Sequence, residues 1–255
     1  MGQGKDNVRR IYLEGIAGGN ARGAVEKYTG HRYTQHSTGV GDGVEGFLAF
    51  FEPFVQRNPK REIEIVRILE DGRWVFCSAY QSLNDGAAQW VTMDMFYTDA
   101  EGLILEHWDT IAPYHAETKS GEDMVGGTRD VDTRADADKT KALVLEFTKQ
   151  VRQEQRASKI HEFVADGLIQ HSPSVAAGRQ GLAEWLESDE AGAYEMLFHL
   201  MGEGDLALTY GKRHAGGKDI AVFDLYRVAG GQIVEHWMNE EEIGPREAWG
   251  NSGKF

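Results

Sequence analysis

The stretch that decides the fold is Leu103–Ile111, LILEHWDTI, which reads as a β-strand that carries a polar site. Successive side chains of a strand point to opposite faces, so His107 and Asp109 share one face, opposite to that of Trp108. Apolar side chains flank the histidine and the carboxylate on their own face. Such a setting is typical of a small-molecule site.

The sequence repeats this strand once. A second copy, IVEHWMN, covers Ile233–Asn239 and keeps the Glu-His-Trp triplet, but Met238 stands where the first copy has Asp109. Another pair of segments, Tyr33–Phe51 and Leu168–Leu186, shares a Gln-His-Ser triplet and several glycines. These matches predict a tandem duplication, and each half is long enough to bury a core of its own.

The expected division has three parts. It places a first domain over residues 1–116, a segment over 117–137 and a second domain over 138–255. The middle segment is rich in acidic residues, glycine and threonine and has almost no large apolar residue. That composition is typical of a linker or an extended arm.

Helices precede strands in the first half. Apolar residues at helical spacing predict helices over residues 6–17, 21–28 and from 44 to before Pro59. Four strand-like runs follow, over residues 62–69, 73–80, 89–98 and 103–111, and turn signals such as Asp71-Gly72 separate them. This order predicts an α+β fold, in which helices pack on one face of a curved antiparallel sheet.

Composition limits the partners. A net charge of −14 and a pI near 5.1 argue against a surface that binds nucleic acid or an anionic membrane. The single cysteine, Cys77, allows no intrachain disulfide and fits a reducing compartment. No segment approaches the roughly 18 apolar residues of a membrane span, and the N-terminus lacks a secretory pattern. We therefore expect a cytoplasmic protein whose partner is a small molecule.

Asp94 is expected beside His107. If the turn between the last two strands centres on Ala100-Glu101, Asp94 pairs directly with His107 on one sheet face. Asp109 follows on that face, where apolar neighbours should raise the pKa of its carboxyl toward the range of a general base or acid. The alternative is that Asp94 and His107 form a buried pair with a structural role only.

The role of His36, which is repeated as His171, has two interpretations. His36 either bonds the backbone or caps the following helix, or it reaches the sheet face and binds a carbonyl of the ligand. Tyr33 is the other candidate for positioning a substrate. Aromatic residues such as Trp90 and Phe51 either line a cavity or fill the core.

Other chemistries leave weaker signals. His36, His107 and Asp109 match the composition of a facial metal triad, so a metal-dependent enzyme is an alternative. The sequence contains neither a phosphate-binding glycine motif nor the G-x-S-x-G pattern, which argues against nucleotide-dependent and serine-hydrolase chemistry.

The second half keeps only part of the candidate site. Asp224, His236 and His171 repeat Asp94, His107 and His36. Because Met238 cannot exchange a proton, we expect this half to be an inactive, degenerate copy.

The segments YTQHSTGVGDGVEGF, MDMF and ILEHWD resemble the SnoaL-like polyketide cyclase family, within the nuclear transport factor 2-like superfamily. The similarity is greatest to bacterial members described as predicted aldol-condensation enzymes. It covers nearly the whole chain, once in each half, and includes the terminal EAWGNSGKF. The resemblance implies a cone-shaped α+β barrel with an internal pocket in each half. It also implies that the halves pack as an intramolecular pseudo-dimer, with further oligomerisation left open.

The same resemblance implies a reaction. In these cyclases the aspartate of Glu-His-Trp-Asp, here Asp109, abstracts a proton next to a carbonyl without metal or organic cofactor. The preceding histidine, here His107, lies in the same pocket and would stabilise the enolate oxygen, with Asp94 orienting it. A cofactor-free cyclase, aldolase, isomerase or hydratase acting on a small, largely apolar substrate is therefore expected. The alternative is a protein that binds an apolar carbonyl compound without turnover.

Overall fold

The computed structural model describes residues 2–255 and divides into two compact units. Unit 1 contains the chain up to Pro113 together with Gly244–Phe255, which we call the C-terminal tail. Unit 2 contains Tyr114–Ile243. The structure thus differs from the expected division, because residues 117–137 belong to unit 2 and the C-terminal tail belongs to unit 1.

Unit 1 contains the predicted helices and the predicted run of four strands. Its helical elements are α1 (Gln3–Arg10), the π-helical segment η1 (Ile11–Ala17), α2 (Ala21–Tyr28) and α3 (Gly43–Arg57). Its strands are β1 (Thr29–Gln35), β2 (Arg61–Asp71), β3 (Trp74–Leu83), β4 (Ala88–Thr98) and β5 (Ile104–Pro113). The tail adds one short helical turn, η4 (Arg246–Ala248).

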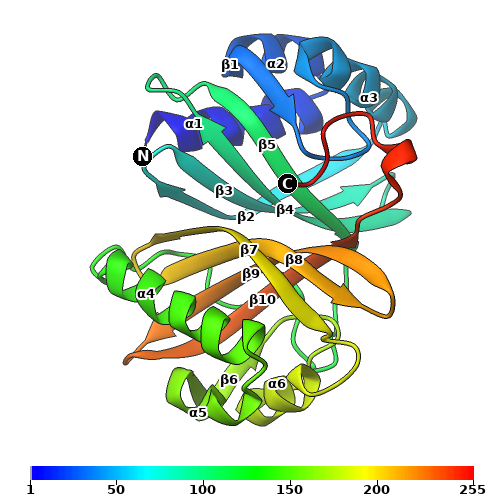
Figure 1. Ribbon diagram of the computed structural model, residues 1–255. Helices are drawn as coiled ribbons and strands as arrows, with labels where there is room; N and C mark the ends of the chain where they lie inside the picture. The colour runs from blue at the N-terminus through cyan, green and yellow to red at the C-terminus, as the bar shows by residue number, and fades with distance from the viewer. Residues whose placement is uncertain (1) are drawn as a thin grey trace. The chain divides into compact units, whose positions relative to one another are not determined.

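The sheet of unit 1 has the order β1-β5-β4-β3-β2 (Figure 1). Strands β2 to β5 form the predicted antiparallel meander. Strand β1 pairs in parallel with β5, so the sheet is mixed rather than wholly antiparallel. The parallel edge strand was not predicted, because its sequence, TGHRYTQ, has no continuous apolar alternation.

The register between β4 and β5 differs from the expected one. Asp94 pairs with Asp109, and Phe96 pairs with His107. The turn lies further along the chain than expected because the Asp99 carboxylate accepts hydrogen bonds from two backbone N–H groups of the turn, at 3.0 and 2.8 Å. A shift by two residues keeps every side chain on its face, so Asp94 and His107 still share one.

Unit 2 repeats the topology of unit 1, with sheet order β6-β10-β9-β8-β7, and β6 pairs in parallel with β10. Its helical elements are α4 (Ala137–Phe147), η2 (Thr148–Gln153), η3 (Ala157–Lys159), α5 (Ile160–Phe163) and α6 (Gly178–Leu186). Its strands are β6 (Val164–Gln170), β7 (Ala193–Glu203), β8 (Leu206–Ala215), β9 (Lys218–Ala229) and β10 (Gln232–Glu242). Each unit is an α+β domain, and the tandem repeat is confirmed.

Each unit has its own apolar core, formed where its helices face its sheet. In unit 1, Val8, Ile11 and Ile16 form the predicted helical stripe and are buried against the sheet. Fully burying such a side chain contributes roughly 1.5–3 kcal/mol, so this stripe fixes the helices on the sheet. No helix within residues 2–255 is long and apolar enough to cross a membrane.

Residues 114–136, which we call the arm, contain no helix or strand and pack on unit 2. The His171 Nδ1 atom lies 2.7 Å from the Asp123 carbonyl oxygen, and Trp237 Nε1 donates to the Gly126 carbonyl at 3.0 Å. The acidic segment is therefore an ordered arm. Its polar groups form hydrogen bonds to the rest of unit 2, and these bonds hold the arm in place.

Candidate functional site

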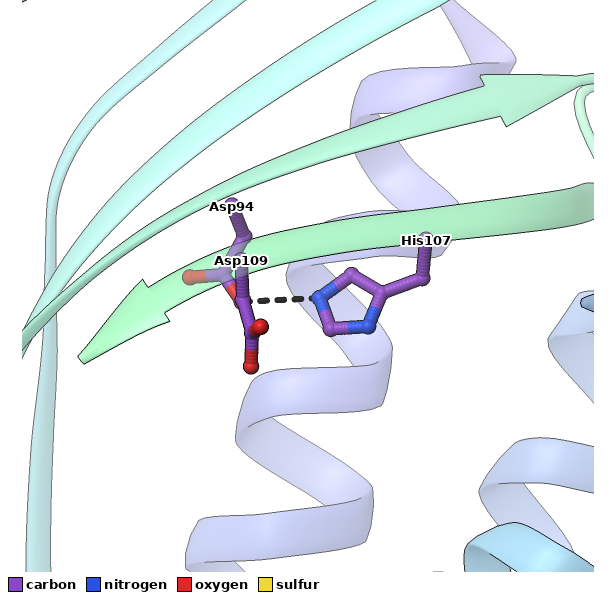
Figure 2. Close-up of side chains that lie close together, drawn as sticks. All are labelled: Asp94, His107 and Asp109. Atoms are coloured by element: carbon purple, nitrogen blue, oxygen red, sulfur yellow. Dashed lines mark hydrogen bonds and ion pairs between the residues drawn. The ribbon is translucent and has the colours of Figure 1, made fainter. Parts of the chain in front are cut away.

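Unit 1 contains a cavity of about 290 Å³ between its helices and its sheet. Its wall is mostly apolar and includes the aromatic side chains of α3 together with Trp90 and Phe96. Of the polar residues in the wall, Asp94, His107 and Asp109 lie on the face of β4 and β5 that looks toward the helices (Figure 2). A mostly apolar cavity with a few polar groups is the usual form of a small-molecule site.

A chain of hydrogen bonds crosses the floor of this cavity. The Nε2 atom of His107 lies 2.9 Å from Asp94 Oδ1, and its Nδ1 atom lies 2.9 Å from Gln35 Oε1. Gln35 Nε2 in turn donates to the Tyr33 hydroxyl at 2.7 Å. Both ring nitrogens of His107 thus have an oxygen partner within hydrogen-bonding distance. Neither nitrogen is left to bind an enolate directly.

Asp109 is paired with a residue that sequence reasoning missed. Lys254, in the C-terminal tail, donates to Asp109 Oδ1 at 2.8 Å and to the Asp109 carbonyl oxygen at 2.9 Å. Burial alone would raise the pKa of the Asp109 carboxyl. The Lys254 ammonium, the His107 charge and a hydrogen bond from Ser37 outweigh burial and hold that pKa below its ordinary value. The expected rise in the pKa of Asp109 was therefore wrong.

Tyr33 offers a hydrogen-bond donor to the cavity. Burial, together with the negative charges of Asp94 and Asp109, raises the pKa of the Tyr33 phenol well above its ordinary value. The hydroxyl therefore keeps its proton at neutral pH. Since Gln35 already donates to the Tyr33 oxygen, the proton on that oxygen is directed elsewhere, and a carbonyl oxygen in the cavity is a suitable acceptor.

The structure brings most of the predicted site residues together, with one exception. Those that line the cavity are Tyr33, Phe51, Trp90, Asp94, His107 and Asp109. His36 does not, contrary to the expectation that it binds substrate. It stacks on Trp108 at 4.4 Å and bonds the Gly253 carbonyl through Nδ1 at 2.8 Å, on the opposite face of β5. The backbone-bonding interpretation of His36 agrees with this geometry.

The metal triad suggested by the sequence is not assembled, because His36 faces away from His107 and Asp109. The structure offers a different set: ligand atoms of Asp94, His107 and Asp109 lie within 4.8 Å of one another. In that set the Lys254 ammonium already binds Asp109, and His107 and Asp94 bind each other. The two carboxylates thus have partners among the side chains, and we derive no step through a metal.

Unit 2 keeps the aspartate–histidine pair but places an arginine beside it. His236 Nε2 lies 2.9 Å from Asp224 Oδ1, as in unit 1. The buried guanidinium of Arg152 lies 2.6 Å from Asp224 Oδ2 and stacks over Tyr194 at 4.7 Å. Burial lowers the pKa of the His236 imidazole, so this ring is neutral at pH 7. Met238 stands at the position of Asp109.

His171 occupies the same kind of place in unit 2 as His36 does in unit 1. It stacks on Trp237 at 5.1 Å and binds Glu235 through Nε2 at 3.0 Å. His36 lies 3.4 Å from Glu106 in the same way. The repeated histidine therefore joins the outer face of each sheet to the segment that packs over it.

No family model and no curated protein matches the sequence. Solved structures do resemble it. A "Putative polyketide cyclase" from Bacillus cereus is 18% identical with a TM-score of 0.38, over 43% of this chain and 74% of that one. A "Putative SnoaL-like polyketide cyclase" from Jannaschia sp. is 19% identical with a TM-score of 0.37, over 43% and 85%. An "NTF-2 like protein of unknown function" from Burkholderia xenovorans is 18% identical with a TM-score of 0.37, over 42% and 87%.

Proposed function

We propose that unit 1 is an enzyme that removes a proton next to the carbonyl group of a small, largely apolar compound. The observation that carries the proposal is an ionised, buried carboxylate, Asp109, in the wall of an apolar cavity that also holds the Tyr33 hydroxyl. The resemblance of the Glu-His-Trp-Asp segment to cofactor-free cyclases supports the same reaction class.

The reaction begins when the Asp109 carboxylate takes the proton from the carbon next to the carbonyl. The electron pair of the broken C–H bond forms a C=C bond, and the carbonyl π electrons move to the oxygen. The resulting enolate oxygen accepts a hydrogen bond from Tyr33, and His107 lies behind Tyr33 in the same hydrogen-bonded chain. Protonated Asp109 then returns the proton to another atom, which gives isomerisation. Alternatively, the enolate carbon attacks a second carbonyl, whose π electrons move to its oxygen, and that oxygen takes the proton from Asp109.

The low pKa of Asp109 limits the substrates that this base can use. A carboxylate with a depressed pKa is fully ionised at pH 7 but is a weak base, so the C–H bond it breaks must be unusually acidic. Compounds whose C–H lies between two carbonyls, or between a carbonyl and an aromatic ring, meet that requirement. Aromatic rings also suit a wall made of phenylalanine side chains.

The test uses 2-tetralone, a bicyclic ketone whose C1–H lies between a carbonyl and an aromatic ring. Protein and 2-tetralone are incubated in D₂O at neutral pD, and loss of the C1 proton signal is followed by ¹H NMR. We expect wild type to accelerate exchange and Asp109→Asn to slow the catalysed rate by roughly 10²–10⁴-fold, the usual contribution of a general base. The matched control is Asp85→Asn, in an exposed turn, which should leave the rate unchanged.

Equal catalysed rates for wild type and Asp109→Asn would contradict the role of Asp109. The second candidate function is binding without turnover, and the ion pair that ties Asp109 to Lys254 is the observation that favours it. It predicts that the NMR signals of residues in the cavity wall shift on adding 2-tetralone, while the exchange rate stays at the level of buffer alone.

A further inference from the structure

Lys254 reaches Asp109 from a distant part of the sequence. It lies in the C-terminal tail, after β10, yet its side chain is buried in unit 1 with a relative exposure of 1%. A buried ammonium costs several kcal/mol of lost hydration unless a charged partner and hydrogen bonds compensate for it. Two bonds to Asp109, one to the side chain and one to the main chain, provide that compensation.

The tail is built to hold Lys254 in place. Asn251 Nδ2 donates to the Ser37 and Val40 carbonyls at 2.5 and 2.8 Å, and Gly250 N donates to the Thr38 carbonyl at 2.8 Å. His36 also bonds the carbonyl of Gly253, the residue directly before Lys254. These bonds fasten the tail along the loop that follows β1, so the position of the ammonium does not depend on Asp109 alone.

From this geometry we infer that Lys254 is a positioning residue for Asp109, holding its carboxylate ionised and in one orientation in the cavity wall. Because Lys254 binds the carbonyl oxygen and Oδ1 of the same residue, rotation of the Asp109 side chain is restricted. Oδ2 is then the oxygen that takes up the reacting proton. The use of that proton rests on the proposed function, whereas the ion pair and its effect on Asp109 do not.

Unit 2 supplies an independent observation. His36 bonds the carbonyl of Gly253, the residue before Lys254, and His171 bonds the carbonyl of Asp123, the residue before Met124. Met124 therefore corresponds to Lys254, as Met238 corresponds to Asp109. Both methionines are buried. Where the carboxylate is lost, the lysine is lost with it, as expected if each charge is tolerated only with the other.

Four charged or titratable groups face Asp109 or its pair. Lys254 approaches from the tail, His107 from β5, Asp94 from β4 and Tyr33 from β1. Burial raises the pKa of the Asp109 carboxyl, and the Lys254 charge is the strongest of the influences that lower it. Removing that charge leaves the effect of burial less opposed, which favours protonation of Asp109.

The first experiment measures the ionisation of Asp109 by ¹³C NMR of aspartate-labelled full-length protein between pH 3 and 8. The Asp109 signal is assigned by its absence from Asp109→Asn. We expect the midpoint to lie below the ordinary aspartate value in wild type, to rise above that value in Lys254→Met, and to return toward wild type in Lys254→Arg. Lys60→Met, at an exposed lysine, is the control and should change nothing. An unchanged midpoint in Lys254→Met would overturn the inference.

The second experiment is a double-mutant cycle in stability. At pH 7, Lys254→Met and Asp109→Met should each lower the denaturant midpoint. The double variant should recover most of the loss, because it leaves no unpaired charge and places methionine at both positions, as in unit 2. The gap between wild type and Lys254→Met should narrow as the pH falls toward 4, since Asp109 becomes neutral in the variant. Additive losses in the double variant would also overturn the inference. The double variant is expected to fold even if a single variant does not.

Neither readout requires turnover. If 2-tetralone exchange is not catalysed but both experiments give the expected results, the proposed function fails and the pairing stands. If exchange is catalysed and Lys254→Met leaves the Asp109 midpoint unchanged, the proposed function stands and the role of Lys254 fails.

Discussion

Unit 1 and unit 2 share a topology and an aspartate–histidine pair, yet only unit 1 has a carboxylate beside that pair. His107–Asp94 and His236–Asp224 have the same 2.9 Å separation. The pair lines the cavity in unit 1, whereas Arg152 covers Asp224 in unit 2, so the pair cannot by itself identify a catalytic site. The comparison assigns the proposed chemistry to the residues that differ, and above all to Asp109.

One substitution explains much of the difference in the two interiors. The buried positions of α1 and η1 recur in α4 and η2, where Val8 corresponds to Val144 and Ile16 to Arg152. Ile16 lines the cavity of unit 1. The Arg152 guanidinium instead binds Asp224 and the Tyr226 hydroxyl, at 2.6 and 3.1 Å. In unit 2 the charge of the buried Asp224 is thus compensated by Arg152.

A second difference lies in the orientation of the glutamine amide beside the histidine. In unit 1 the Gln35 oxygen faces His107 because its nitrogen donates to Tyr33. In unit 2 the amide is reversed, since the Gln170 oxygen accepts from Ser172 N at 2.9 Å and its nitrogen faces His236 at 3.0 Å. In unit 1 the phenol of Tyr33 is thus connected to His107 through one amide.

The largest expected effect is a loss of stability in unit 2. Arg152→Met leaves the Asp224 carboxylate buried without its cation, and breaking a buried pair in this way costs about 3–5 kcal/mol. Ile16→Met, the matched change in unit 1, exchanges one apolar side chain for another and should cost less than about 1.5 kcal/mol. Chemical denaturation of both variants measures the difference. Equal losses would mean that the Arg152–Asp224 pair is not what distinguishes the interiors.

Tyr33→Phe tests whether the phenol stabilises the enolate. Removal of one donor to a developing oxyanion typically lowers the rate by roughly 10²–10³-fold, or about 2.7–4 kcal/mol. We expect that loss in the 2-tetralone exchange assay, with binding of 2-tetralone nearly unchanged. Tyr80→Phe, at the phenol that bonds Gln89 outside the cavity, is the control. A rate within a factor of two of wild type would remove Tyr33 from the mechanism.

Ile16→Arg converts a position of unit 1 to its counterpart in unit 2. The new guanidinium can bind Asp94 and would fill part of the cavity, so we expect 2-tetralone to bind at least about tenfold more weakly, or about 1.4 kcal/mol. Titration by NMR measures the affinity, and Ile16→Val, which keeps the cavity open, provides the reference. Undiminished binding would place the ligand site away from Ile16.

The smallest effect concerns pH. The pKa of His236 is lower in the folded protein than in the unfolded chain, so the unfolded chain binds more protons below about pH 6.5. The stability contributed by neutral His236 is fully present above that pH and is lost as the pH falls through the folded value. Denaturant midpoints of wild type between pH 7.5 and 5.5 should fall, and should fall less in His236→Gln. A steeper fall in His236→Gln would contradict this assignment.

Much of the fold was predictable because it depends on local patterns. The helix over residues 21–28 and the four-strand meander follow from apolar spacing and turn residues, and the duplication follows from the repeated triplets. The shared face of His107 and Asp109 is a consequence of strand periodicity alone. The parallel strand β1 and the register of β4 against β5 were missed because they depend on a distant strand and on the Asp99 side chain.

The sequence by itself determined two α+β units, the residues on the inner face of β5 and the loss of the carboxylate at Met238. Only the tertiary structure decided the ionisation of Asp109 and the place of His36. Both depend on the C-terminal tail, whose Lys254 and Gly253 lie far from these residues in sequence and contribute no periodic signal. Charge pairing acts through space over a few ångströms, so its partners can come from any part of the chain.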